Sequence, residues 1–291
     1  MCLNPALQCI KNRHAKSLNS CNTSVSYVYC LATERNSLIE RRQPFQAGAG
    51  NLKAAFIVST GRTGTDFFTT LYNEVVSNAW SLHEPKPAFR GRAREFLQRD
   101  PTPVEKLRFR ASRQLRHLLR PEDCYIETNY HLFAAIPLIR ESFPDAYVVH
   151  VVRDGRAVVT SWLNRWRYIT NDHIRPEHVP GDPAVDHWGD WNPLQKLAWY
   201  WVTVNRRVEQ TKPDLTVKFE DIFKGERKGV YRVLELLPCS QYDTEDVEKY
   251  LNRKVNRNPM EFFPPYAEWP ERWKKQFWEI AGEEMRKWGY A

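Results

Sequence analysis

Two stretches of the chain combine a short, continuous apolar run with a following helical pattern. Residues 54–60, AAFIVST, form a run of strand length without polar alternation, which is typical of a strand buried on both faces of a parallel sheet. The apolar residues that follow recur at helical spacing, at Phe67, Phe68, Leu71 and Val75. Residues 146–162 repeat this order of strand, polar turn and helix. We therefore expect a three-layer α/β domain with a mainly parallel central sheet and helices on both faces.

The first 50 residues lack this periodicity. They contain four of the six cysteines of the chain, Cys2, Cys9, Cys21 and Cys30. A zinc or disulfide cluster is one interpretation, but the wide, irregular gaps include no close C-x-x-C pair. We favour a poorly ordered leader of reduced thiols over residues 1–50, ended by the small-residue linker FQAGAGNLK, and one catalytic domain over 51–291.

The net charge of the chain indicates which classes of ligand it attracts. Lys and Arg number 43 against 35 Asp and Glu, a net charge of +8, which favours an anionic ligand or surface and leaves nucleotides, nucleic acids and acidic glycans open. No apolar stretch approaches the roughly 20 residues needed to span a bilayer, and the N-terminus lacks the apolar core of a secretion signal. We expect an intracellular, cytoplasmic protein without a transmembrane segment.

The first strand–loop–helix unit carries the pattern of a phosphate-binding loop. Gly61 and Gly64 lie in the turn, where the missing Cβ allows a positive φ and lets a ligand approach the backbone. Such a loop directs amide N–H groups and the helix dipole at one point. Thr65 and Asp66 stand where a nucleotide triphosphate site has Lys and the hydroxyl that holds magnesium, and the cation is instead Arg62. This predicts a nucleotide with fewer linked phosphates, bound without a metal.

The second unit carries a matching pair of polar residues. Arg153 ends the apolar run, and Ser161 follows eight residues later on the helical segment. An arginine at a strand end and a hydroxyl about two turns into the helix can converge on one phosphate. A plain glycine turn in the first unit, or an Arg-Asp pair that only caps a helix in the second, would explain each unit separately.

Together the two units resemble the sulfotransferases that use 3′-phosphoadenosine 5′-phosphosulfate (PAPS), whose fold is similar to that of P-loop NTPases. GRTGT at 61–65 is similar to the family's K/R-x-G-T core, and the resemblance extends over roughly residues 52–291, closer to bacterial, glycan and tyrosyl-type members. It implies that four residues contact the 5′ side of the nucleotide: Arg62, Thr63, Gly64 and Thr65. Asp66 departs from the hydroxyl often found there. Arg153 and Ser161 match the Arg and Ser that bind the 3′-phosphate.

The resemblance also implies where the catalytic base lies. Glycan- and tyrosine-modifying members carry a Glu in a segment like SLHEPKPAF at 81–89, which makes Glu84 the expected base, with His83 beside it. Arg62 is expected to neutralise the leaving oxygen, because its guanidinium does not give up a proton readily.

A second candidate for the base comes from the cytosolic small-molecule members. Their catalytic His lies in a K-T-H strand, and the matching stretch YIETNYHLF has Glu127 at the Lys position and Asn129 at the His position. Asparagine cannot act as a base. His131 lies two residues on, hence on the same face if the strand continues, and is the alternative to Glu84.

Two other functions explain less of the sequence. A P-loop phosphotransferase that uses ATP and magnesium explains only the first loop, and a nucleic-acid-binding protein explains only the charge. The acceptor is left open among glycan, peptide, lipid and small alcohol.

Four further segments carry weaker expectations. Residues 171–191 are polar and interrupted by prolines, as expected of an acceptor lid, and residues 90–120 predict a solvated basic helical face. The acidic pair Glu220 and Asp221, within residues 214–223, either caps the next helix or matches the acidic pair that follows the family's late strand. Lys254 or Arg257 would reach the nucleotide.

Overall fold

The computed structural model describes residues 53–86, 89, 91–120, 123–165, 174–223, 227–237, 240–253 and 262–290. The predicted leader over 1–50 and the segment with Lys254 and Arg257 lie outside these ranges. Within them, none of the helices has the length and apolar character that crossing a bilayer requires.

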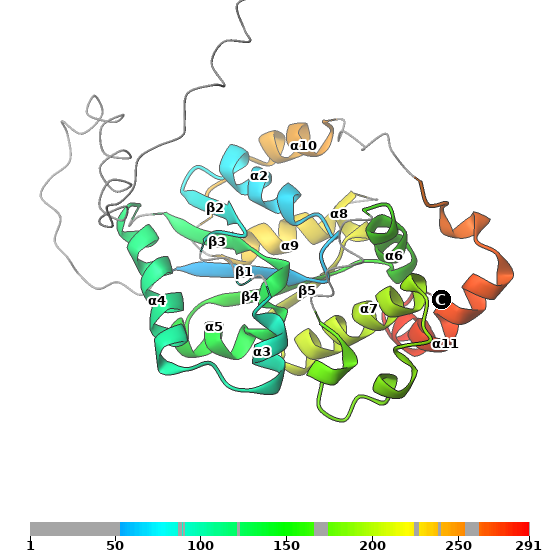
Figure 1. Ribbon diagram of the computed structural model, residues 1–291. Coiled ribbons are helices and arrows are strands. Elements are labelled where there is room, and N and C mark those ends of the chain that lie inside the picture. Colours follow the sequence, from blue (N-terminus) through cyan, green and yellow to red (C-terminus); the bar gives the residue numbers. More distant parts are fainter. Residues whose placement is uncertain are drawn as a thin grey trace, which may run out of the picture. The chain divides into compact units, whose positions relative to one another are not determined.

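A five-stranded sheet forms the centre of the domain (Figure 1). Its strands are β1 (Ala54–Ser59), β2 (Ala79–His83), β3 (Cys124–Thr128), β4 (Tyr147–Val152) and β5 (Leu215–Lys218). The order across the sheet is β2-β3-β1-β4-β5, and each neighbouring pair is parallel. From central β1 the chain passes to β2 and β3 on one side and then crosses to β4 and β5 on the other side. Open parallel sheets bind ligands at such a switch point.

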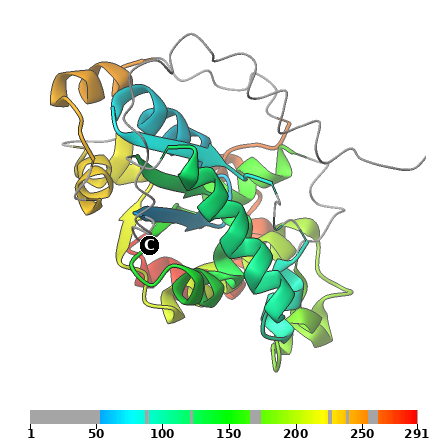
Figure 2. The same cartoon turned by 90° about the vertical axis from the view of Figure 1, so that its left-hand side faces the viewer.

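Helices cover both faces of this sheet (Figures 1 and 2). The longer ones are α2 (Thr65–Val75), α4 (Pro103–Leu118), α6 (Gly155–Leu163), α7 (Pro193–Gln210), α9 (Lys228–Leu236), α10 (Thr244–Leu251) and α11 (Glu271–Lys287). Shorter helices are α3 (Ala93–Gln98), α5 (Ile136–Ser142) and α8 (Glu220–Phe223), and 3₁₀ turns are η2 (Tyr130–Ala134), η4 (Pro176–His178), η5 (Pro183–His187) and η6 (Tyr266–Glu268).

The central strand explains why its sequence shows no alternation. Ala55 and Ile57 pack in a core with α2, α9 and α10, whereas Phe56 and Val58 pack on the opposite face with α4, α5 and α7. All six residues of β1 are therefore buried, as expected for a parallel strand covered on both sides. The predicted three-layer α/β fold with a parallel central sheet is confirmed.

The predicted lid, residues 171–191, is described from residue 174. This part is packed rather than free, because η4 and η5 fold it and Ile174 is 2% exposed. The indole Nε1 of Trp199 on α7 donates to Asp182 Oδ2 at 2.9 Å, so a hydrogen bond links this part of the chain to that helix.

The predicted basic helical face over 90–120 includes one buried arginine. Arg113 of α4 is fully buried, and its guanidinium makes two hydrogen bonds to Glu127 of β3, Nε to Oε2 at 3.0 Å and Nη2 to Oε1 at 2.8 Å. Arg99 forms ion pairs with Glu95 and Glu105. Sequence spacing could not show these pairs, since the partner of Arg113 lies on a different element.

Candidate active site

The carboxyl ends of the five strands meet at one edge of the sheet, because all the strands are parallel. Each predicted site residue lies at the end of a strand at this edge, on the segment that follows the strand, or on the helix after it. The loop at residues 60–64 follows β1, Glu84 follows β2, η2 follows β3, and Arg153 follows β4. The topology therefore brings together the two loops that the sequence placed about 90 residues apart.

The loop after β1 has the backbone of an anion-binding turn. Gly61, Arg62 and Gly64 have φ values of 72°, 57° and 77°, all in the left-handed region. At Gly64 a side chain is also excluded by space, because a Cβ would lie 2.8 Å from the ring of Phe219. Gly64 is the N-cap of α2 and has no side chain to cap it, so the first N–H groups of the helix and its positive dipole face the edge of the sheet.

Arg62 connects the two predicted loops. Its Nε donates to Ser161 Oγ on α6 at 2.9 Å, and its carbonyl oxygen accepts from Arg153 Nη1 at 2.7 Å. Arg153 lies over the ring of Phe219, 4.4 Å from its centroid. The pair Arg153 and Ser161 and the turn at Gly64 therefore form one cluster.

This cluster carries positive charge that nearby carboxylates offset only in part. Burial, followed by the nearby Arg165 and Arg153, lowers the pKa of Arg62, and burial lowers the pKa of Arg153. Asp66 acts in the opposite direction on Arg62, and Glu220 and Asp154 do so on Arg153. Neither guanidinium forms an ion pair with a carboxylate of the described residues. Arg153 Nε and Thr63 Oγ1 are buried and have no hydrogen-bond partner there. An anion at this point would satisfy these groups, so the residues present fit a phosphate-bearing ligand.

Glu84 lies between two histidines. Its carboxylate oxygens are 3.4 Å from His83 Nε2 and 3.7 Å from His131 Nε2, and its side chain is 8% exposed. The backbone of Glu84 has a φ of 43°, and its N–H donates to the carbonyl oxygen of Thr128 at 3.0 Å. A non-glycine residue in this conformation costs about 1 to 3 kcal/mol and occurs preferentially at functional sites.

His83 is held by contacts on both ring nitrogens. Nδ1 is 3.0 Å from Thr128 Oγ1, and Nε2 is 3.1 Å from Asp66 Oδ1. Thr128 Oγ1 in turn lies 2.6 Å from Thr69 Oγ1. In the neutral ring, an Nε2–H donates toward the Asp66 and Glu84 carboxylates while Nδ1 accepts from the Thr128 hydroxyl. Asp66, which stands where triphosphate sites hold a metal-binding hydroxyl, contacts His83.

The prediction that His131 continues the strand face of Asn129 is wrong. β3 ends at Thr128, and Asn129 caps the 3₁₀ turn η2 by accepting the N–H of His131 at 3.0 Å. Because the chain turns there, His131 is carried to Glu84, and the two alternative bases become neighbours. Glu127 is held by Arg113, by Tyr125 Oη at 3.0 Å and by Asn129 Nδ2 at 3.1 Å, so it supports the turn from the core.

Sequence reasoning did not find the contacts that hold the second loop. Glu220 Oε1 accepts the N–H of Asp154 at 3.1 Å, and Oε2 accepts the Tyr290 hydroxyl at 2.6 Å. Arg156 Nη2 donates to the carbonyl oxygen of Tyr290 at 3.0 Å. Burial, and then Glu220, raises the pKa of Tyr290. The acidic pair was visible in the sequence, but the contact of Glu220 with Tyr290 was not.

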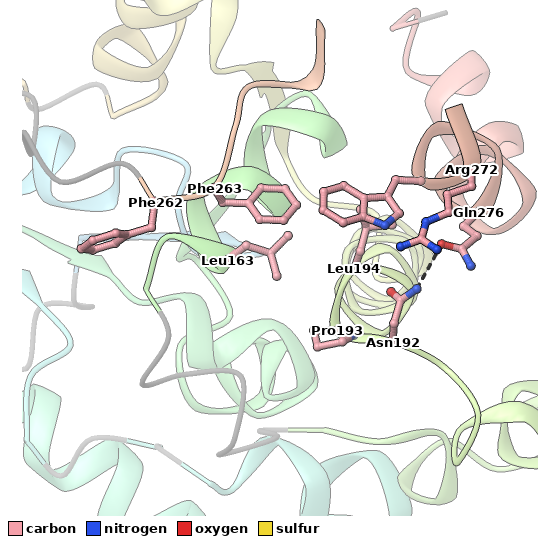
Figure 3. Close-up of a pocket in the computed structure, with 9 residues that line it drawn as sticks. Leu163, Asn192, Pro193, Leu194, Phe262, Phe263, Arg272 and Gln276 are labelled. Atoms are coloured by element: carbon pink, nitrogen blue, oxygen red, sulfur yellow. Dashed lines mark hydrogen bonds between the residues drawn. The ribbon is translucent and has the colours of Figure 1, made fainter. Parts of the chain in front are cut away.

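A separate cavity of about 530 Å³ lies between α6, α7 and α11 (Figure 3). Apolar side chains make up most of its lining: Leu163, Pro193, Leu194, Phe262, Phe263 and Trp273. Arg272 is at one side, and Asn192 Nδ2 donates to Gln276 Oε1 at 3.0 Å. None of the predicted site residues is part of this lining, so the cavity is distinct from the Arg62 cluster.

Comparison with known proteins gives a likeness of structure. Neither a protein-family model nor a curated protein matches the chain. The sulfotransferase domain from the curacin biosynthetic pathway matches with a TM-score of 0.50 at 11% identity, covering 83% of this chain and 99% of that one. A sulfotransferase from Alicyclobacillus acidocaldarius matches with a TM-score of 0.44 at 13% identity, covering 82% and 94% of the two chains. A sulfotransferase from Mycobacterium avium matches with a TM-score of 0.43 at 13% identity, covering 84% and 79%. The chain has the fold of the sulfotransferases.

Proposed function

We propose that the chain is a sulfotransferase that moves a sulfuryl group from PAPS to a hydroxyl or amine of an acceptor. The observation that carries the proposal is the cluster of Arg62, Arg153 and Ser161, in which two guanidinium groups without a carboxylate partner among the described residues join the two predicted nucleotide loops. The sulfotransferase fold supports it. A nucleotide that carries anionic groups at both its 5′ and 3′ positions has the charge distribution that such a cluster would neutralise.

The residues of the two loops would divide the nucleotide between them. Arg62 and the backbone N–H groups of Thr63, Gly64 and Thr65 would hold the 5′ side, where the positive end of the α2 dipole adds to the attraction. Arg153 and Ser161 would hold the 3′-phosphate. When bound, PAPS supplies the sulfuryl group, whose sulfur bonds to the acceptor oxygen as its bond to the 5′-phosphate oxygen breaks.

The base would be Glu84, which takes the acceptor proton. Its carboxylate is largely shielded from solvent and lies within 3.4 Å of His83 and 3.7 Å of His131, so a proton taken from the acceptor has neighbouring sites to reach. Asp66 contacts His83 Nε2 and would orient its ring. Arg62 would stabilise the charge that develops on the leaving oxygen, a task for a fixed cation in a partly buried site.

The test is thermal stabilisation by 3′,5′-adenosine bisphosphate in the presence of a chelator. At one hundred times its Kd, the ligand adds about 2.7 kcal/mol to the free energy of unfolding, which for a domain of this size raises Tm by roughly 5 to 10 °C. Arg232→Ala, an exposed arginine of α9, is the matched control and should keep the full shift. Stabilisation by ATP with magnesium, and none by the bisphosphate, would instead support a phosphotransferase.

A cytoplasmic location stays a prediction from the sequence. Counting free thiols in the native protein before and after reduction tests it, because structural disulfides are rare in cytosolic proteins.

A further inference from the structure

Helix α4 is apolar on two opposite sides. Its inner side packs Phe109, which is fully buried, into the core beside Arg113. Its outer side exposes large apolar residues at Val104, Leu107, Leu115 and Leu118, and Leu119 follows at the helix end. Their exposed fractions range from 57% to 72%, and these five are the majority of the seven large apolar residues that the described residues expose. Burial in the domain therefore accounts for only one side of this helix.

The exposed residues form one continuous stripe. They follow at intervals of three and four residues, with exposed Ala111 between Leu107 and Leu115, so they lie on one face of the helix. From Val104 to Leu118 the stripe extends about 21 Å. Figure 2, turned to this side of the domain, shows α4 in front, with no described element over it.

The charge beside the stripe is positive. Arg108 and Arg110 are exposed next to it, and neither forms an ion pair with a described residue. The one acidic residue of α4, Glu105, is turned away from the stripe, where it caps the helix with Thr102 and pairs with Arg92 and Arg99. The outer face of α4 is therefore apolar and cationic.

The positive charge beside the stripe limits which binding partners can cover it. A second copy of the chain that docks through the same face would bring two further arginines, Arg108 and Arg110 of that copy, to an interface that is already cationic. Residues 1–52 of the chain carry six Lys and Arg against two acidic residues, so they do not complement the face either. An anionic occupant does. A helix that lies outermost on the domain also suits a flat surface better than a narrow ligand.

We propose that α4 docks the protein on the surface of a bilayer that contains anionic phospholipids. The Leu and Val side chains of the stripe enter the boundary between headgroups and acyl chains, and Arg108 and Arg110 contact lipid phosphates. The protein then binds as a peripheral protein. This inference does not depend on the proposed sulfuryl transfer, because no residue of the Arg62 cluster or of the Glu84 cluster takes part.

Vesicle co-sedimentation of the full chain tests the proposal. Vesicles of phosphatidylcholine with about one third phosphatidylserine should bind the protein at least tenfold more tightly than vesicles of phosphatidylcholine alone, and 0.5 M salt should weaken this binding. The double variant Leu107→Gln with Leu115→Gln should lose at least tenfold in vesicle affinity, and so should Arg108→Gln with Arg110→Gln. All four positions are exposed, so Tm should be unchanged.

The matched control is Val185→Gln, which replaces another exposed apolar residue, 49% exposed, outside α4. It should bind vesicles like the wild type. Three outcomes overturn the proposal: no binding of the full chain to anionic vesicles, equal loss of binding in the Val185 control, or a dimer in solution that the Leu107 and Leu115 variant dissociates. The last outcome would assign the stripe to a second copy of this chain.

Discussion

Arg153→Ala separates the two tasks that the structure allows for this arginine. The guanidinium has a direct role if it binds the 3′-phosphate. It also has a structural role, because Nη1 donates to the carbonyl oxygen of Arg62 at 2.7 Å and the group lies over the ring of Phe219. Removing it therefore affects both the 3′-phosphate and the shape of the first loop.

The two roles predict losses of nucleotide affinity that differ in size. A hydrogen bond to a charged partner contributes about 1.5 to 3 kcal/mol, so losing the 3′-phosphate contact should weaken 3′,5′-adenosine bisphosphate about 10- to 150-fold. The contact to the Arg62 carbonyl is internal to the protein and exists with or without nucleotide. Its loss therefore acts on affinity only through the shape of the loop and should weaken every adenylate by less than about tenfold. Adenosine 5′-monophosphate, which has no 3′-phosphate, should therefore suffer only the smaller loss.

Isothermal titration of both nucleotides into wild type and Arg153→Ala measures this difference. The control is Arg232→Ala, which should leave both affinities unchanged. If the 5′-monophosphate loses as much affinity as the bisphosphate, Arg153 acts only by shaping the loop, and its assignment to the 3′-phosphate is wrong. If neither nucleotide loses affinity, the nucleotide does not bind at this cluster.

Three other predictions follow from the same structure. Glu84→Gln should lower turnover at least 100-fold and leave nucleotide affinity unchanged, whereas His131→Asn should cost less; a normal rate in the first variant and a collapse in the second would move the base to His131. Glu127→Gln should lose about 3 to 5 kcal/mol of unfolding free energy in urea, because it leaves the charge of Arg113 buried without its partner, and a loss below about 1 kcal/mol would contradict this account. Burial lowers the pKa of His150 to about 4, below the unfolded value of 6.5. The unfolded chain therefore binds the proton first, and the free energy of unfolding should fall by up to about 3 kcal/mol as pH drops from about 6.5 to 4. Urea titrations of wild type and His150→Asn across this range should diverge, and parallel curves would refute the linkage.

The candidate site was predictable where a local pattern carries its own chemistry. Gly61 and Gly64 indicated a turn with positive φ, and both have one, because no other residue takes that conformation so cheaply. Arg153 and Ser161 were chosen for their spacing along one strand and helix, and the structure brings both to Arg62. What spacing could not indicate is that Ser161 contacts the side chain of Arg62 itself, from 99 positions away.

The contacts of Glu84 show where such prediction ends. Nothing in the sequence paired Glu84 with His131, because a strand was expected to continue past Asn129 and the 3₁₀ turn was not foreseen. The position of Asp66 in the first loop likewise did not indicate its contact with His83.

By itself the sequence determined the two strand–loop–helix units that carry the candidate nucleotide site, because apolar periodicity and glycine act over a few neighbouring residues. Only the tertiary structure decided which charges meet. It buried Arg113 against Glu127, left Arg62 and Arg153 without a carboxylate partner among the described residues, and turned a leucine stripe of α4 outward. Those outcomes depend on which elements pack together, and the free energy of packing belongs to whole surfaces rather than to any local run of residues.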